Sequence, residues 1–364
     1  MRRFLLAAGI LTGLALLVTA CDPFGDDDDD DDDGGGNGGG GGDTLAEIQD
    51  RGELICGVND AVPGFGFVEA EGDPAGFDVD FCRAVAAAIF GDAEAVQYIP
   101  LTAQARFEAL SAGEIDVLIR NTTNTVSRDA DLNSTFAPTT FYDGQGMMVR
   151  EGEFESIEDM DGATVCVLQG TTTEQNLADR FDSAGLSYTP LTFEDNETLQ
   201  AAFFEERCDG WTSDKSQLAG VRSAFPDDVG GPDCCVIFEE TFSKEPLGPA
   251  TRDGETQWTE VVTWVVNGMI IAEEFGVTSE NVDDFINDPQ NPEVARLLGV
   301  ALEGEEVFDP GLGLDPTFMQ EVIRQVGNYG EVYERNLGPL ELTREGTLNA
   351  LYADGGILYA PPWR

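Results

Sequence analysis

Short apolar runs alternate with helical patterns along most of the chain, and this alternation limits the possible folds more than any other feature. The apolar runs are typical of buried strands, and the stretches between them space their apolar residues as helices do. In chain order these segments are a strand at 54–58, helices at 80–89 and 103–112, strands at 117–119 and 164–168, and a helix at 174–182. The pattern predicts an α/β fold with largely parallel sheets.

Two of the helical stretches also predict which residues form the core. Each carries apolar side chains four positions apart, which places them on one buried face. These residues are Phe81, Val85 and Ile89 in the first stretch, and Trp258, Val262 and Val266 in the second. The 364-residue chain exceeds what one core usually supports, so two lobes are expected.

The first 20 residues have the features of a secretion signal. Arg2 and Arg3 precede an apolar run at 4–17, which is too short to span a bilayer comfortably. The segment 18–21, Val-Thr-Ala-Cys, resembles a bacterial lipobox, in which Cys21 would be acylated and become the first residue of the mature chain. The alternative is a plain signal peptide with an incidental cysteine. We expect a lipid-anchored protein rather than a membrane-spanning one.

Residues 21–44 form the lipidated Cys21 and a linker in this interpretation. An aspartate run at 26–33 precedes a glycine-rich run at 34–42, and neither composition can bury a core. The aspartates repel one another and the glycines are flexible, so the segment is typical of a solvated tether. Metal binding by the aspartates is the alternative.

The formal net charge of −51 excludes some partners. Nucleic acid and anionic membrane surfaces repel such a chain, so membrane contact is expected through the lipid anchor only. The acidic excess suits a salty habitat, where counterions screen the repulsion.

The cysteine and histidine counts limit the chemistry. Six cysteines follow Cys21, an even number that favours disulfides in an exported chain: Cys56, Cys82, Cys166, Cys208, Cys234 and Cys235. The chain has no histidine, so the commonest zinc ligand and the commonest general base are both missing. We expect no metal, no cofactor and no enzymatic activity.

The segment from Gly76 to Ile89 resembles the signature of the family 3 bacterial extracellular solute-binding proteins. Other segments resemble the general L-amino-acid branch of that family: CGVN at 56–59, RNTTNTVSRD at 120–129, FYDGQGMMV at 141–149, LQGTT at 168–172, KEPLGP at 244–249, QVGNYGEVYERNLGP at 325–339 and GGILYAPPWR at 355–364. The resemblance covers most of the mature chain.

The resemblance implies a type II periplasmic-binding-protein fold, in which two α/β lobes joined by a two-strand hinge enclose a ligand cleft. Lobe 1 would comprise 45–145 and 247–364, and lobe 2 would comprise 146–246. The crossings fall near 144–146 and 246–249, where glycines and prolines suit a hinge.

A free amino acid is a zwitterion, and the resemblance supplies partners for both of its charges. Arg128 falls at the family's carboxylate-clamping arginine, whose forked guanidinium suits a carboxylate. Thr123 falls where the family uses a hydroxyl for the ligand backbone, and Asn121 and Thr122 precede it. The alternatives are a surface arginine for Arg128 and an ordinary turn or cap for the threonines.

Lobe 2 would contribute the remaining contacts. Gly170, Thr171 and Thr172 follow a strand and open a helix, so their backbone N–H groups could receive the same carboxylate, although threonine is also an ordinary helix cap. Asp214 falls at the family's ammonium-binding carboxylate; its alternative is a helix cap before Lys215. With partners on both lobes, the closed clamp should be the liganded state.

Side-chain selectivity is less well defined. Asn124 stands where this branch commonly has Trp, so a stacking wall would be missing. Arg106 could pair with an acidic ligand side chain, or could lie on the polar face of an ordinary helix. The pocket-lining candidates are Phe65, Phe67, Arg106, Tyr142 and Gln145.

The lobe assignment also suggests disulfides within each lobe. Cys56 and Cys82 fall in lobe 1, and Cys166 and Cys208 fall in lobe 2. Pairing them in this way leaves the adjacent Cys234 and Cys235 as a vicinal bridge or as free thiols.

The function implied by the resemblance is capture of L-amino acids outside the cytoplasmic membrane, by a monomer that serves the permease and ATPase subunits of an ABC importer. An exported cyclohexadienyl or arogenate dehydratase on the same fold is the main alternative. A receptor ectodomain is a third possibility, which the lack of a later membrane segment disfavours.

Overall fold

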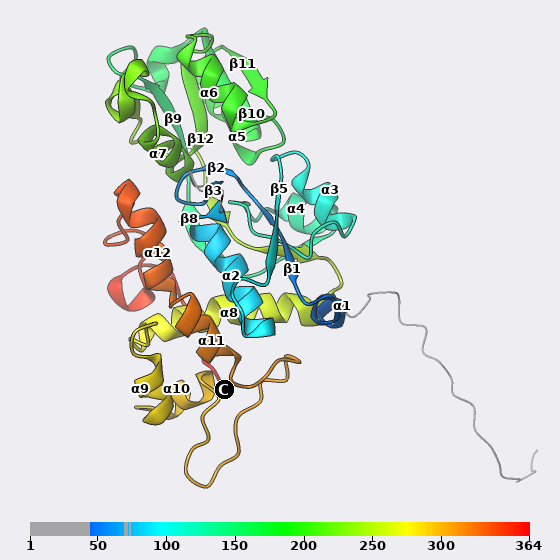
Figure 1. Cartoon of the computed structure of the whole chain (residues 1–364). Helices are drawn as coiled ribbons and strands as arrows, with labels where there is room; N and C mark the ends of the chain where they lie inside the picture. Colours follow the sequence, from blue (N-terminus) through cyan, green and yellow to red (C-terminus); the bar gives the residue numbers. More distant parts are fainter. Residues whose placement is uncertain (1–43, 69–71, 73) are drawn as a thin grey trace, which may run out of the picture. The chain divides into compact units, whose positions relative to one another are not determined.

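The computed structural model describes residues 44–68, 72 and 74–364 of the chain (Figure 1). The predicted signal at 1–20, the lipidation site Cys21 and nearly all of the linker at 21–44 lie outside the described residues. Within the described part, no helix is both long enough and apolar enough to cross a bilayer.

Two five-stranded sheets organise the described residues. The first sheet has the order β5-β1-β6-β15-β7, with strands β1 Leu54–Val58, β5 Val96–Pro100, β6 Val117–Leu118, β7 Ser134–Phe136 and β15 Ala250–Arg252. The second has the order β11-β10-β12-β9-β13, with strands β9 Gln145–Arg150, β10 Ala163–Leu168, β11 Tyr188–Phe193, β12 Gly210–Asp214 and β13 Cys235–Ile237. A small sheet contains β2 Ala61–Val62, β3 Gly66–Val68 and β4 Pro74–Ala75.

The expectation of largely parallel sheets is confirmed at one side of each sheet and wrong at the other. Strand β1 runs parallel to β5 and β6, and β10 runs parallel to β11 and β12. Strands β15, β7, β9 and β13 pair antiparallel. Strands β9 and β15 enter their sheets directly from the other half of the fold rather than through a helical crossover, which is what parallel neighbours require.

The helices divide between the two sheets. Those that pack with the second sheet are α5 Thr172–Ala184, α6 Asn196–Phe204 and α7 Lys215–Ser223. Those that pack with the first sheet or with one another around it are α1 Thr44–Arg51, α2 Phe77–Phe90, α3 Arg106–Ser111, α4 Val126–Asp131, α8 Thr256–Glu274, α9 Val282–Asn287, α10 Pro292–Leu297, α11 Phe318–Gln325 and α12 Tyr329–Leu337. Short 3-10 turns lie at Ile157–Met160, Asp227–Val229, Gly231–Cys234, Gly338–Leu340 and Tyr352–Asp354.

The predicted helices are present, with shifted ends. Helix α2 begins earlier than the predicted 80–89, directly after Gly76. The φ of Gly76 is 133°, a value that glycine adopts readily and other residues rarely do. A side chain at Gly76 would collide with the backbone of Phe65. Helix α3 begins later than the predicted 103–112, because the Thr102 hydroxyl takes the Ala105 N–H into a turn.

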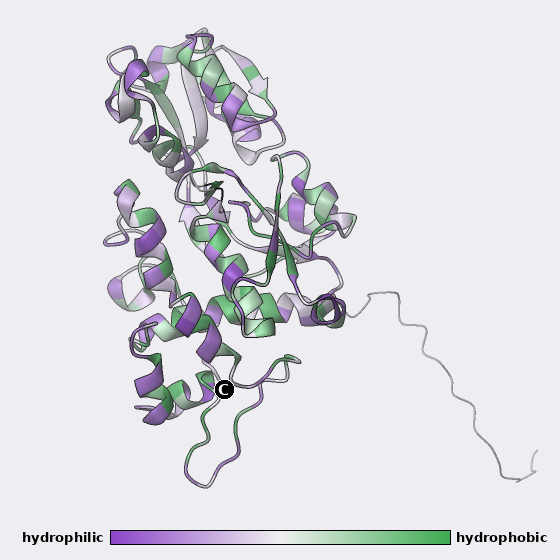
Figure 2. Ribbon diagram, in the orientation of Figure 1, coloured by the Kyte–Doolittle hydropathy of each residue, from purple (hydrophilic) through white to green (hydrophobic). Residues whose placement is uncertain are grey.

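The predicted core residues are confirmed. Five of the six are buried and Ile89 packs partly buried against the same cluster, in which α2 and α8 contribute most of their length (Figure 2). The second sheet buries side chains on both faces: Met148 joins one cluster, and its neighbours Met147 and Val149 join the other.

Two short strands connect the halves of the fold. Strands β8 Phe141–Asp143 and β14 Glu245–Leu247 pair antiparallel, with Asp143 opposite Glu245. The chain passes through β8 toward β9 of the second sheet, and returns through β14 toward β15 of the first. The predicted crossings at 144–146 and 246–249 therefore fall at the ends of this strand pair.

The disulfide hypothesis is confirmed. The structure contains the bridges Cys56–Cys82 and Cys166–Cys208, and it joins the adjacent Cys234 and Cys235. The first two bridges each tie a strand, β1 or β10, to a segment of the same half of the fold.

Asp78 lies buried in the first turn of α2 and supports the loop that follows β6. Its Oδ2 accepts a hydrogen bond from the backbone N–H of Asn121, which has an unusual φ of 33°. Burial raises the pKa of Asp78 to about 7, against the smaller opposing effects of the Asn121 N–H and of Arg120.

We predict that the disulfides differ in their contribution to stability. Replacing Cys166 and Cys208 with alanine, at a separation of 42 residues, should lower the free energy of unfolding by about 4 kcal/mol, because the unfolded chain regains loop entropy. Replacing Cys234 and Cys235, at a separation of 1, should have a much smaller effect. Urea denaturation followed by tryptophan fluorescence measures both pairs. Equal losses would contradict the prediction.

We also predict a pH dependence that originates at Asp78. The pKa is about 7 in the folded protein and near 3.8 in the unfolded chain, so the stabilising contribution is full below the lower value and is lost as the pH rises to about 7. In the wild type, the free energy of unfolding should therefore decline between about pH 4 and pH 7.5, and Asp78→Asn should make this decline smaller by roughly 4 kcal/mol. Denaturation at both pH values tests it, with the exposed Asp50→Asn as control. An unchanged decline in Asp78→Asn would contradict the assignment.

Candidate functional site

A small buried pocket lies where residues of both sheets meet, and we call it the inner pocket. Its volume is about 20 Å³, which holds little more than a single water. It is lined by Ala103, Arg106, Arg120, Asn121, Thr123, Leu168, Thr171, Thr172, Thr173, Ser213, Asp214 and Gln217. An amino acid cannot enter this space unless the two halves of the fold separate.

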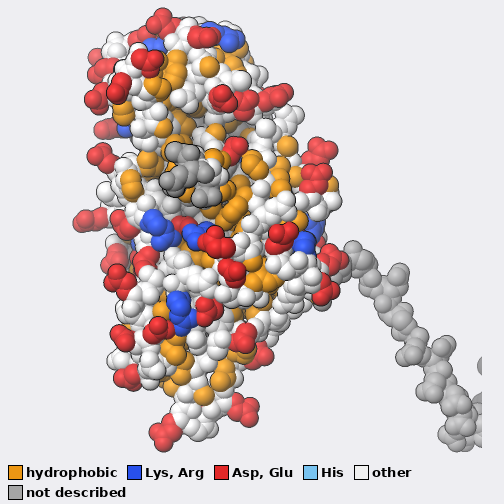
Figure 3. Space-filling model, in the orientation of Figure 1, with side chains coloured by type: hydrophobic (Ala, Val, Ile, Leu, Met, Phe, Trp, Pro, Cys, Tyr) orange, Lys and Arg blue, Asp and Glu red, His pale blue; other side chains and the backbone are white. Residues whose placement is uncertain are grey.

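Two buried arginines, Arg106 and Arg120, line the inner pocket, and a third, Arg128, lines the larger pocket beside it. Arg106, Arg120 and Arg128 are only 3%, 5% and 6% exposed, and among the described residues no carboxylate lies within 4 Å of their guanidinium groups. By contrast, the surface visible in Figure 3 carries many acidic side chains and few cations. Buried charges are costly unless they are paired, so this cluster favours an anion at the site.

The three arginines use only some of their N–H donors in hydrogen bonds within the protein. Arg106 Nη1 donates to Thr122 Oγ1 at 3.4 Å, and its buried Nε has no partner among the described residues. Arg120 Nε donates to the carbonyl of Leu101. Burial lowers the pKa of Arg106 well below its usual value, and the nearby Arg128 and Arg120 lower it further. Arg106 is therefore buried rather than solvated, and its pairing with an acidic ligand side chain stays a prediction.

Arg128 lies in the short helix α4, which Thr125 caps through its hydroxyl. Its Nη1 donates to the carbonyl of Thr123 at 2.8 Å, and its guanidinium stacks over the ring of Phe107. These two contacts hold the guanidinium in one orientation and leave further N–H donors for a ligand. Burial lowers the pKa of Arg128, while Glu245 and Asp214 oppose this effect.

Asp214 approaches the inner pocket from the end of β12, on the opposite side. It is 5% exposed, and its buried Oδ1 has no hydrogen-bond partner among the described residues. Burial raises its pKa well above the usual value, and the neighbouring Asp143 and Glu245 add to the shift. Its side chain makes no capping bond to α7, and Lys215 bonds instead to the carbonyl of Glu239. The side chain therefore lacks a donor, which a ligand ammonium would supply.

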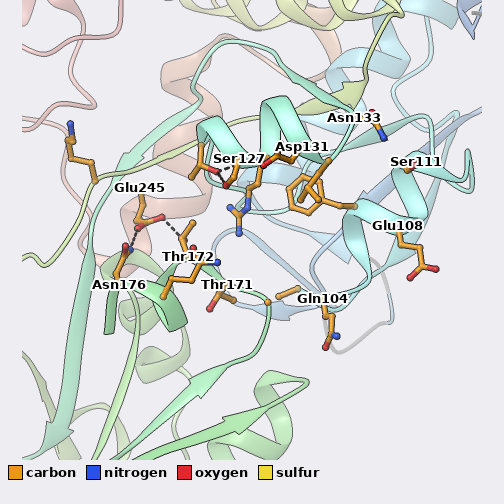
Figure 4. A pocket seen from close by; sticks show the side chains of 18 residues that line it. Gln104, Glu108, Ser111, Ser127, Asp131, Asn133, Thr171, Thr172, Asn176 and Glu245 are labelled. Atoms are coloured by element: carbon orange, nitrogen blue, oxygen red, sulfur yellow. Dashed lines mark hydrogen bonds between the residues drawn. The ribbon is translucent and has the colours of Figure 1, made fainter. Parts of the chain in front are cut away.

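Glu245 was not among the predicted site residues, yet its carboxylate bonds to residues of both halves of the fold. It lies on β14 and is 1% exposed. Its Oε2 accepts from the hydroxyls of Thr123 and Thr172, both at 2.7 Å, and its Oε1 accepts from Asn176 and Ser243. Figure 4 shows the bonds to Thr172 and Asn176. A sequence signal existed, because an acidic residue precedes a proline at the predicted return crossing.

The predicted loop at 170–172 lies between β10 and α5, as expected. The Thr171 hydroxyl caps α5 by accepting from the Glu174 N–H, and it donates to the carbonyl of Leu168. Gly170 N–H donates to the Glu174 carboxylate, while Thr172 donates its hydroxyl to Glu245. Of the three, only Thr171 and Thr172 line the inner pocket.

Other predicted residues hold the site's surroundings in place. The Asn121 amide accepts from Asn59 and donates to Gln217 of α7, which links the two halves of the fold. Thr122 donates to the carbonyl of Arg120. Gln145 is fully buried; its amide nitrogen donates to Thr173 and Thr212, and its oxygen is unpartnered among the described residues.

The remaining candidates do not line the inner pocket. Phe65 packs edge-on against Phe77 and Phe141 in the core, and Asn124 is exposed. Phe67 lies in β3 and Tyr142 in β8, and both are partly buried away from the pocket lining. Their assignment to ligand binding stays a prediction that these contacts do not favour.

A larger pocket, which we call the outer pocket, adjoins the inner one. Its volume is about 610 Å³, and it shares Ala103, Thr171 and Thr172 with the inner pocket. Its lining is rich in polar side chains, many of which are drawn in Figure 4: Gln104, Glu108, Ser111, Ser127, Arg128, Asp131, Asn133, Gln175, Asn176, Lys244 and Glu245. A ligand that reaches Arg128 could extend into this space.

Comparisons with known proteins agree on the family. The family model for bacterial extracellular solute-binding proteins, family 3, matches residues 54–285. The general L-amino acid-binding periplasmic protein AapJ of Rhizobium johnstonii is 48% identical over 88% of this chain and 93% of its own. The glutamate/glutamine/aspartate/asparagine-binding protein BztA of Rhodobacter capsulatus is 45% identical, with the same coverage of 88% and 93%.

A solved structure extends the agreement to the fold. The ABC transporter/periplasmic binding protein from Brucella ovis with glutathione bound is 44% identical, with a TM-score of 0.84, and the match covers 89% of this chain and 100% of that chain. All three relatives are named as binding proteins, and the dehydratase alternative finds no support among them. The expected type II periplasmic-binding-protein fold is confirmed, and the chain belongs to the family 3 bacterial extracellular solute-binding proteins.

Proposed function

We propose that this protein captures free L-amino acids outside the cytoplasmic membrane and delivers them to an ABC importer. The observation that carries the proposal is the set of unpaired charged groups in and beside one small pocket. Arg106 and Arg120 line this pocket together with Asp214, whose Oδ1 lacks a donor among the described residues, and Arg128 lines the adjoining outer pocket. A zwitterion supplies the anion and the donor at once.

Each charge of the ligand has a partner in this proposal. Arg128 binds the α-carboxylate, supported by the backbone N–H groups at 170–172, and the Thr123 hydroxyl binds the ligand backbone. Asp214 binds the α-ammonium, and Arg106 stands ready for an acidic or polar ligand side chain. The names of AapJ and BztA, which bind general L-amino acids and glutamate, glutamine, aspartate and asparagine, support this ligand class.

Closure of a clamp follows from the same charges. We place the lobes at 45–145 with 247–364 and at 146–246, with β8 and β14 as the hinge. In the open clamp, water solvates Arg128 and Asp214; in the closed clamp, the ligand replaces that water. Because each ligand charge meets its partner out of water, a zwitterion stabilises the closed state more than a ligand that carries one charge.

The cellular setting forms part of the proposal. Cys21 carries the lipid anchor, residues 22–44 tether the clamp outside the membrane, and the protein acts as a monomer that docks on permease and ATPase subunits. The ABC-transporter description of the Brucella ovis relative supports these partners.

A peptide of glutathione size is a second candidate ligand. The outer pocket of about 610 Å³ exceeds the needs of one amino acid and adjoins the inner pocket. The Brucella ovis relative is described with glutathione bound. A γ-glutamyl amino-acid end in the inner pocket would leave the rest of such a peptide in the outer one.

A thermal-shift panel tests the proposal. Residues 44–364 are heated with common L-amino acids, glutathione and two sugars, at high and low salt. A ligand that binds only the folded state raises the melting temperature as its concentration exceeds its Kd. We expect shifts with several L-amino acids and none with the sugars. Absence of a shift with every amino acid at both salts, after removal of copurified ligand, would contradict the function.

Arg128→Ala tests the clamp itself. Removing one partner of a buried charge pair should raise the Kd for the best amino acid by about 100-fold or more, while the variant stays folded. Arg207→Ala, an exposed arginine of the proposed lobe 2, is the matched control and should bind as the wild type does. Calorimetry measures both. Retained wild-type affinity in Arg128→Ala would show that the carboxylate site is misassigned.

A further inference from the structure

Glu245 joins three separate parts of the fold at one carboxylate. It lies on β14, Thr123 lies between β6 and α4, and Thr172 begins α5. Both hydroxyls approach the same oxygen, Oε2, at 2.7 Å, although these threonines are 122 and 73 positions away along the chain. The carboxylate is 1% exposed, and no cation of the described residues lies within ion-pair distance.

This arrangement fixes the direction of both hydroxyl groups. A hydroxyl carries one proton to donate and two lone pairs that accept. Because Thr123 and Thr172 both donate their proton to Glu245, each keeps only lone pairs for any other partner. The two hydroxyl oxygens lie 3.4 Å from each other. Because each hydroxyl has a single proton and donates it to Glu245, neither threonine has a proton left for the other.

The two hydroxyls therefore present acceptors at one corner of the inner pocket. Asp214 lines the same pocket, and its Oδ1 lacks a donor among the described residues. A ligand carboxylate placed against the threonine hydroxyls would meet lone pairs, whereas an ammonium would meet two acceptors there and could turn a third N–H toward Asp214. The arginines that can take the carboxylate are Arg106, Arg120 and Arg128.

We propose that Glu245 is a positioning residue, which turns the hydroxyls of Thr123 and Thr172 into acceptors and so commits this corner of the pocket to the ligand's N–H donors. The proposal rests on the proposed function and deepens it. It also specifies the role of two predicted residues, because it assigns the Thr123 and Thr172 hydroxyls to the ligand ammonium. Primary amines are then the ligand class, and des-amino acids are rejected.

Calorimetry with two matched probes tests the proposal. L-glutamate carries the ammonium, and glutarate keeps both carboxylates but lacks it. Glu245→Gln should raise the Kd for L-glutamate by about tenfold or more and the Kd for glutarate by less than about twofold. The reason is that only the ammonium depends on the oriented hydroxyls. Glu240→Gln makes the same charge change at the exposed ion pair with Arg180, and should alter neither probe.

A double-mutant cycle separates orientation of the hydroxyls from simple charge attraction. Thr123→Val and Glu245→Gln should each raise the Kd for L-glutamate about tenfold. The double variant should have a Kd little higher than either single variant, because both substitutions remove the same interaction. Independent effects would instead multiply to about 100-fold and would overturn the proposal. The cycle decides the matter also if glutarate binds too weakly to measure.

The outcomes distinguish this proposal from the function on which it rests. If wild-type protein binds no amino acid of the panel, the function fails; if it binds another amino acid better, that one and its des-amino analogue replace the pair. If Glu245→Gln raises the Kd of both probes equally, Glu245 only supports the structure of the site and the proposal is contradicted. If Glu245→Gln does not fold, the half-buried Thr172→Val carries the test, with the same expected loss of selectivity for the amine.

Discussion

The buried arginines without ion-pair partners are the constraint on which the rest of the site depends. A folded chain with a formal charge of −51 has carboxylates in excess, yet none of the described ones lies within 4 Å of Arg106, Arg120 or Arg128. Holding such cations out of water is costly unless a ligand completes them. Asp214 Oδ1 lacks a hydrogen-bond donor among the described residues, so a molecule that carries both charges suits the site.

The fold supplies these charges from two independent sheets. Arg128 lies in α4, between strands β6 and β7 of the first sheet, and Asp214 ends β12 of the second sheet. Glu245 lies on β14, in the strand pair that connects the two halves. Such a site is complete only when the halves meet, because no one element carries more than part of it. The disulfides lie within each half and none joins the two, so they stiffen the halves without locking the clamp.

The sequence predicted the α/β halves and the core helices, because hydrophobic periodicity is a local signal. The family resemblance singled out Arg128, Thr123 and Asp214, which the structure buries, and their binding roles stay predictions. The sequence placed Glu245 at the return crossing but could not show its hydrogen bonds, since these arise when β8 and β14 pair and bring it to threonines 122 and 73 positions away. Helical spacing alone could not show that Arg106 is buried, and Phe65 fitted a pocket wall as well as the core cluster that it joins.

A crystal structure with a bound L-amino acid tests the central claim most directly, because it shows where each ligand charge lies. The account predicts the α-carboxylate at the guanidinium of Arg128, and the α-ammonium at Asp214 and the hydroxyls of Thr123 and Thr172. A ligand held wholly in the outer pocket, or one bound with its charges reversed, would contradict it.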